Sequence, residues 1–81
     1  MTHPEQFPNL GRSFQLMKLQ DQLDAISDQS IMGLCIKSAM MKKTPLRIIA
    51  RTIIDSYHHN PTATINIVGD ETISLIWSLY S

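Results

Sequence analysis

Hydrophobic residues recur at helical spacing in the first third of the chain. Leu16, Leu19, Leu23 and Ile26 follow one another at intervals of three, four and three residues. This spacing places them on one side of an α-helix. We therefore predict a first helix over about residues 10–26, with this stripe facing a core.

A second helix is predicted over about residues 29–41, and it differs from the first because two of its sides are apolar. One side holds Ile31, Leu34, Cys35 and Ser38, and the other holds Met32, Ile36, Ala39 and Met40. A short helix of this kind either lies at the centre of a core or exposes one apolar side to a partner.

A third helix is predicted to begin at Thr44-Pro45, an N-cap residue followed by proline at the first helical position. Asn60-Pro61 should end it, because the residue before proline disfavours helical geometry. Its expected buried stripe consists of Leu46, Ile49, Ile53 and Tyr57.

Residues 62–80 show a different pattern, in which β-branched residues alternate with others on both sides of a turn signal at residues 69–71. A three-residue loop there would pair Ile67 with Ile73 and Ile65 with Leu75, which makes one face apolar. The pattern predicts a β-hairpin. The expected fold is therefore a small α+β domain, with three helices followed by a C-terminal β-hairpin.

The alternative is an all-α fold in which residues 71–80 form a fourth helix. Asp70 could cap it, and its apolar side would consist of Ile73, Ile76, Trp77 and Tyr80. This alternative leaves Ile65, Ile67 and Val68 in an apolar loop, an unfavourable place for them. The hairpin is preferred for that reason.

Length and cysteine content limit the setting. We expect residues 1–9, which contain two prolines, to form a flexible arm and residues 10–81 to form one small domain. The single Cys35 excludes an internal disulfide and a cysteine-based zinc site, and its apolar neighbours predict a buried, inert thiol. With no signal peptide or membrane span in the sequence, we expect a soluble, cytoplasmic protein.

Charge is unevenly distributed although the net charge is zero. Residues 29–54 carry five cations and no acid, whereas residues 1–28 and 55–81 carry an excess of acids. The candidate surface for nucleic acid or an acidic partner consists of Lys42, Lys43, Arg47 and Arg51. Two helices joined by a short turn, then a hairpin, resemble the order of elements in a winged-helix domain. That resemblance of architecture implies a DNA-binding regulator that uses the third helix.

Two observations oppose DNA binding: the neutral net charge, and the acidic Asp70 and Glu71 at the tip of the expected wing. No residues indicate an enzyme either. His58 and His59 are adjacent, so their side chains point apart, and no further ligand lies at metal-binding spacing. We therefore expect no catalytic residue, cofactor, metal or small-molecule substrate.

Methionine is frequent, and Met32, Ile36, Met40 and Met41 are the candidate apolar surface for a partner. Gly33 inside a helix is predicted to admit another helix at close range. A chain this short buries a modest core, which favours a homodimer or a protein partner. The preferred function is a protein–protein interaction module that acts as adaptor, inhibitor or regulator of a larger protein. The alternative is a small DNA-binding transcriptional regulator.

Overall fold

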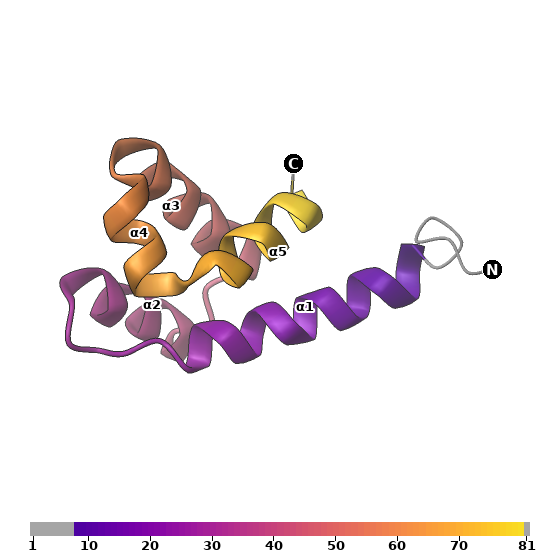
Figure 1. The fold of residues 1–81 in the computed structure, drawn as a ribbon. Coiled ribbons are helices and arrows are strands. Elements are labelled where there is room, and N and C mark those ends of the chain that lie inside the picture. The colour runs from indigo at the N-terminus through magenta and orange to yellow at the C-terminus, as the bar shows by residue number, and fades with distance from the viewer. Residues whose placement is uncertain (1–7, 81) are drawn as a thin grey trace.

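The computed structural model describes residues 8–80, and this part of the chain forms five α-helices and no strand. The helices are α1 (Pro8–Asp24), α2 (Ile31–Met41), α3 (Leu46–His59), α4 (Pro61–Val68) and α5 (Asp70–Tyr80). The N-terminal end of α1 projects past the other four helices (Figure 1). Most of the predicted arm, residues 1–7, lies outside the described residues.

The predicted C-terminal hairpin is wrong, because residues 61–80 form α4 and α5 instead. Asn60 caps α4 by accepting a hydrogen bond of 3.2 Å from the amide of Ala63, and Pro61 is the first helical residue. Gly69, with φ of 90°, separates the two helices. Asn-Pro thus both ends α3 and starts α4, and the all-α alternative is the one that fits.

Burial explains why helix prevails over local strand propensity at residues 61–80. The buried positions here are Thr64, Val68, Thr72, Ile73, Leu75, Ile76 and Leu79, and they include a series at intervals of three or four residues: 64, 68, 72, 76 and 79. Strand propensity depends strongly on context, so packing on one side of a helix can override it. The short α4 also removes the objection to the all-α alternative, since Ile65 and Ile67 pack partly against the core rather than lying in a loop.

Helix α5 lies at the centre of the described fold, with α1, α3 and α4 packed against it. The core residues are Leu19, Leu23, Ile26, Ile36, Ile49, Ala50, Ile53, Val68, Ile73, Leu75, Ile76 and Leu79. Two threonines are also fully buried. The Thr64 hydroxyl lies 2.9 Å from that of Ser56, whereas the Thr72 hydroxyl has no hydrogen-bond partner among the described residues.

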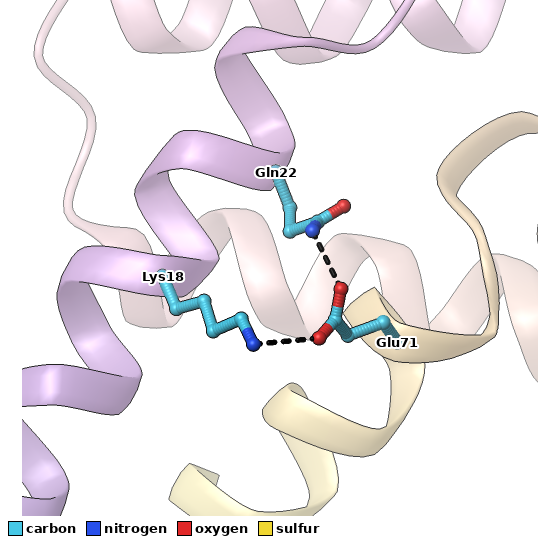
Figure 2. Close-up of polar contacts among 3 residues, drawn as sticks. All are labelled: Lys18, Gln22 and Glu71. Carbon is cyan, nitrogen blue, oxygen red and sulfur yellow. Dashed lines mark hydrogen bonds and ion pairs between the residues drawn. The ribbon is translucent and has the colours of Figure 1, made fainter.

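Polar contacts align α1 with α5. The carboxylate of Glu71 accepts a hydrogen bond of 2.7 Å from Gln22 and forms an ion pair of 2.9 Å with Lys18 (Figure 2). Arg12 donates to the carbonyl oxygen of Leu79 at 3.0 Å. The Lys18–Glu71 pair is about half exposed, so it contributes at most about 1 kcal/mol. These contacts fix the direction of α1, while the buried leucines provide most of its stabilisation.

Two predicted details of the helix starts need correction. Helix α3 begins at Leu46 with Pro45 as its N-cap and no side-chain cap, so Thr44 does not have the predicted capping role. Gly33 is required by the loop before α2, since an added Cβ would overlap the carbonyl oxygen of Ser27. The predicted approach of a second helix at Gly33 is therefore not the reason for this glycine.

The predicted end of α3 at Asn60-Pro61 is confirmed. Within residues 8–80, none of the helices combines the length and the apolar character needed to cross a bilayer.

Candidate functional site

One side of α2 is apolar and exposed. We call it the α2 face and define it as Ile31, Leu34, Cys35, Ser38 and Met41. The exposed fractions are 82% for Ile31, 53% for Leu34 and 83% for Met41. None of these five side chains is charged, and Lys42 borders the face in a hollow that it shares with Leu34, Cys35 and Ser38. A contiguous exposed apolar patch of this kind marks an interaction surface in most soluble proteins.

The apolar surface continues from α2 onto α3. Ile48 of α3 is 45% exposed, and it shares with Cys35 a small hollow of about 90 Å³ between the two helices. The residues that line this hollow are Met32, Cys35, Ile36, Ala39, Thr44, Ile48, Ile49 and Thr52. A partner on the α2 face would therefore also contact Ile48 of α3.

The structure does not bring the four predicted apolar partner residues to one surface. Ile36 lies in the core, Met32 and Met40 are half-buried against it, and Met41 alone of the four is exposed. Of the two apolar sides of α2, the side with Met32 and Ile36 faces inward. The expectation of a buried Cys35 is wrong for the same reason, since its thiol belongs to the outward side and is exposed.

A second surface is the groove between α3 and α5, which we call the α3–α5 groove. It has a volume of about 370 Å³. Its lining consists of Arg47, Ala50, Arg51, Ile54, Asp55, His58, Ile76, Trp77 and Tyr80. Ala50 and Ile76 are only 1% exposed and form an apolar floor, whereas both arginines are exposed.

Aromatic side chains form the α5 side of this groove. The ring of Trp77 lies 6.1 Å from that of His58 in an edge-on arrangement, so these two residues join α5 to the end of α3. The Arg12 guanidinium lies 5.7 Å from the centre of the Tyr80 ring. Trp77 is 38% exposed and is the one tryptophan in the chain.

The charges of the groove are unequal at its two ends. Arg47 and Arg51 lie one turn apart on α3, and Asp55 follows one turn later. Within residues 8–80, none of these three side chains forms an ion pair. One end of the groove is therefore positively charged, and the other combines a carboxylate with His58 and Trp77.

The predicted basic surface is divided by the structure. Arg47 and Arg51 line the α3–α5 groove, whereas Lys42 and Lys43 lie in the turn between α2 and α3 and line two other hollows. Lys43 has a positive φ of 60°, which allows this turn to be tight. All four side chains are exposed. Without a hairpin there is no wing, so the resemblance to a winged-helix domain is lost and a helix–turn–helix pair remains.

His58 and His59 have different surroundings. His58 contacts Trp77, whereas Nδ1 of His59 lies 2.9 Å from the carbonyl oxygen of Asp55. No group of three or more histidine, cysteine, aspartate or glutamate side chains within the described part of the chain is placed to hold a metal ion.

The aromatic residues of the groove were missed by sequence reasoning, because Trp77 and Tyr80 were placed in the predicted hairpin. The all-α alternative grouped them with Ile73 and Ile76 by helical spacing, but no local pattern indicated that they would border a groove with Arg47 and Arg51.

In comparisons with known proteins, no family model, curated protein or solved structure matches this chain.

Proposed function

We propose that this chain is a small protein–protein interaction module that forms a homodimer through the α2 face and regulates a larger protein. The observation that carries the proposal is the exposure of Ile31 and Met41, each more than four fifths exposed at the two ends of an uncharged stripe. Burying a side chain of this size is worth about 1.5–3 kcal/mol. Covering the face with an apolar partner is therefore favourable.

A second copy of the chain fits the α2 face because the face is complementary to itself. In an antiparallel pair of α2 helices related by a two-fold axis at residue 36, each residue of one copy meets its counterpart in the other. Ile31 then lies opposite Met41, and Leu34 lies opposite Ser38. Large residues meet at the ends, and a large residue meets a small one near the centre, which permits close packing.

The area required sets the extent of the interface. A stable dimer buries about 800 Å² on each partner. This is roughly a seventh of the molecule's 5734 Å² of accessible surface. Helix α2 alone is only about 16 Å long. The proposed interface therefore includes Ile48 and Thr52, on the side of α3 that adjoins α2.

An exposed single cysteine suits a reducing compartment, so we place this dimer in the cytoplasm. The role we propose is binding and not catalysis. A DNA-binding function is the second candidate, and the exposure of Lys42, Lys43, Arg47 and Arg51 next to a helix–turn–helix pair favours it. We rank it second because Asp55 adjoins the arginines.

Sedimentation equilibrium from micromolar to submillimolar concentrations tests the dimer. We expect a monomer–dimer equilibrium for the wild-type chain and a monomer for Leu34→Glu, because the new carboxylate would be buried without a partner. The matched control is Phe14→Glu, which alters an apolar residue of similar exposure on α1 and should leave the dimer intact. A wild-type chain that stays monomeric over the whole range would refute the proposed dimer.

Cys35 provides a second readout of the same contact. In the antiparallel arrangement the two Cys35 residues are about 3 Å apart along the helix axis, on facing sides of the two helices. This is within the reach of a disulfide. We expect mild oxidation to convert most of the wild-type chain into a cross-linked dimer. The Leu34→Glu variant should form little cross-linked dimer under the same conditions. Equal cross-linking of both would indicate random collision.

A further inference from the structure

We infer that the α3–α5 groove binds an acidic peptide segment of a partner protein, with two carboxylates on Arg47 and Arg51 and an apolar side chain against Trp77. This inference goes beyond the proposed dimer and does not depend on it, because the two surfaces share no residue. It identifies the chemistry of the larger protein that the module would recognise.

The spacing of the two arginines matches an extended acidic peptide. Arg47 and Arg51 are four residues apart on α3, so their Cα atoms are separated by about 6 Å along the helix axis. Alternate residues of an extended strand are about 6.6 Å apart and point to the same side. Two acidic residues separated by one other residue can therefore each meet one guanidinium. Such charge-assisted hydrogen bonds are among the strongest that side chains form.

The rest of the groove suits an apolar side chain. Beyond the arginines, the floor is formed by Ala50, Ile54 and Ile76, and Trp77 borders it from α5. Trp77 is 38% exposed and its indole ring already lies edge-on to His58, so a ligand can cover it without a large rearrangement. From Arg47 to His58 the groove extends about 16 Å along α3, the length of roughly five extended residues.

Asp55 favours a peptide over a nucleic acid. A nucleic-acid strand carries a charge on every nucleotide, so a strand along this groove would place a phosphate near the carboxylate of Asp55. A peptide can have its acids at the Arg47 end only. The position of Lys42 and Lys43 supports the same choice, since they lie outside the groove and add nothing to a ligand bound within it.

The test is a titration of the full chain with an acetylated, amidated hexapeptide of sequence Glu-Ala-Glu-Ala-Leu-Ala, at low salt. Trp77 is the one tryptophan, so its fluorescence reports occupation of the groove directly. We expect saturable binding with a change in Trp77 emission. The peptide with lysine in place of both glutamates should not bind.

Two variants of equal charge change identify the site. Arg47→Glu/Arg51→Glu should weaken binding at least tenfold, since both carboxylates would then meet like charges. The matched control, Lys42→Glu/Lys43→Glu, should change the affinity for the peptide by less than about threefold, which is the size of a long-range charge effect. Far-ultraviolet circular dichroism checks the fold of both. If the arginine variant unfolds, Arg47→Gln/Arg51→Gln serves in its place.

Three results would overturn the inference. The first is the absence of peptide binding at low salt. The second is an equal loss of binding in both double variants, which would indicate net charge and not a site. The third is tighter binding of duplex DNA than of the peptide, with DNA binding lost in both double variants. That result would assign Arg47, Arg51 and the turn lysines to a nucleic-acid surface. The dimer proposal is unaffected by each of these results.

Discussion

The α2 face, which Ile48 extends, and the α3–α5 groove lie on two sides of helix α3. They differ in shape and chemistry. Neighbouring residues of α3 divide between them, since Ile48 extends the apolar face and Arg47 lines the groove. The face is an uncharged stripe along α2. The groove is concave and combines two arginines, a carboxylate and aromatic rings over an apolar floor.

This difference predicts two kinds of recognition in one small molecule. Association through an uncharged apolar face depends on the buried area and is nearly independent of salt. Recognition through arginines depends on charge and weakens as ions screen it. The two surfaces can therefore be separated experimentally, by substitutions that affect one of them and by conditions that affect them unequally.

The largest effect is expected at the centre of the α2 face. Leu34→Glu and Ser38→Lys should each weaken the homodimer roughly 100-fold, since each buries an unpaired charge. In the antiparallel arrangement, residue 34 of one copy meets residue 38 of the other. An equimolar mixture of the two variants should therefore regain dimers, with Glu opposite Lys at one contact and the wild-type pair at the other.

Sedimentation velocity of each variant and of their mixture measures this recovery. The hexapeptide should bind to all of these samples as it binds to the wild-type chain. A mixture that stays monomeric would contradict the antiparallel register, even if the α2 face is the interface. Weaker peptide binding in Leu34→Glu would show that the two surfaces are energetically coupled.

Sequence reasoning identified much of α1, α2 and α3, because their apolar residues repeat at the spacing of one helical stripe. It failed over residues 62–80, where Ile65, Ile67, Ile73 and Leu75 alternate as in a strand. The residues that the structure buries there include Thr64 and Thr72, which no hydrophobic pattern counts as core. Helical periodicity was present, but two polar residues concealed it.

The limits at the two surfaces have different causes. Periodicity showed that α2 has two apolar sides, but it contains no information on which side other helices cover. The structure turns Ile36 inward and Leu34 outward. At the groove, Arg47 and Arg51 were selected from their charge and spacing. Trp77 reaches them only through the packing of α5 on α3, a contact between distant segments that local patterns do not record.

The next largest effect is expected from salt. Raising sodium chloride from low to near-physiological concentration should weaken hexapeptide binding roughly fivefold to tenfold, because screening shields exposed guanidinium and carboxylate groups. The dimer should change by less than about twofold under the same conditions. In matched buffers, fluorescence titration measures the peptide affinity and sedimentation equilibrium measures the dimer affinity. Equal salt dependence at both surfaces would contradict the assignment of different chemistry to them.

A smaller effect is expected from Thr72→Val, which should stabilise the fold. The Thr72 hydroxyl is fully buried and has no partner among the described residues, so its removal should raise the free energy of unfolding by about 1 kcal/mol. The control is Thr64→Val, which removes a buried hydroxyl that pairs with Ser56. This change should lower the free energy of unfolding by a similar amount.

Urea denaturation measures both threonine variants, and opposite signs are the expected result. Because Thr72 and Thr64 touch neither surface, dimer and peptide affinities should both stay at the wild-type value. No stabilisation in Thr72→Val would show that the hydroxyl of Thr72 is satisfied in solution. Stabilisation in Thr64→Val would show that the Thr64–Ser56 pair does not offset the burial of the hydroxyl.

The smallest effect concerns the selectivity of the groove. Asp55→Asn removes the one acid among the described residues that line the groove. An exposed like charge is worth a few tenths of a kcal/mol, so binding of the hexapeptide should tighten only about twofold to threefold. A peptide with a third glutamate in place of leucine should gain more affinity from Asp55→Asn, because Asp55 repels acids at that end of the groove. The matched control is Asp28→Asn, an exposed acid outside the groove that makes the same change in net charge.

Fluorescence titration of both peptides against both variants gives a direct test of this selectivity. If Asp55→Asn and Asp28→Asn have equal effects, net charge accounts for the change and Asp55 does not shape the groove. If duplex DNA begins to bind to Asp55→Asn alone, the carboxylate is what keeps a polyanion from the arginines. A single acid would then decide whether a helix–turn–helix pair with exposed arginines recognises a protein segment or a nucleic acid.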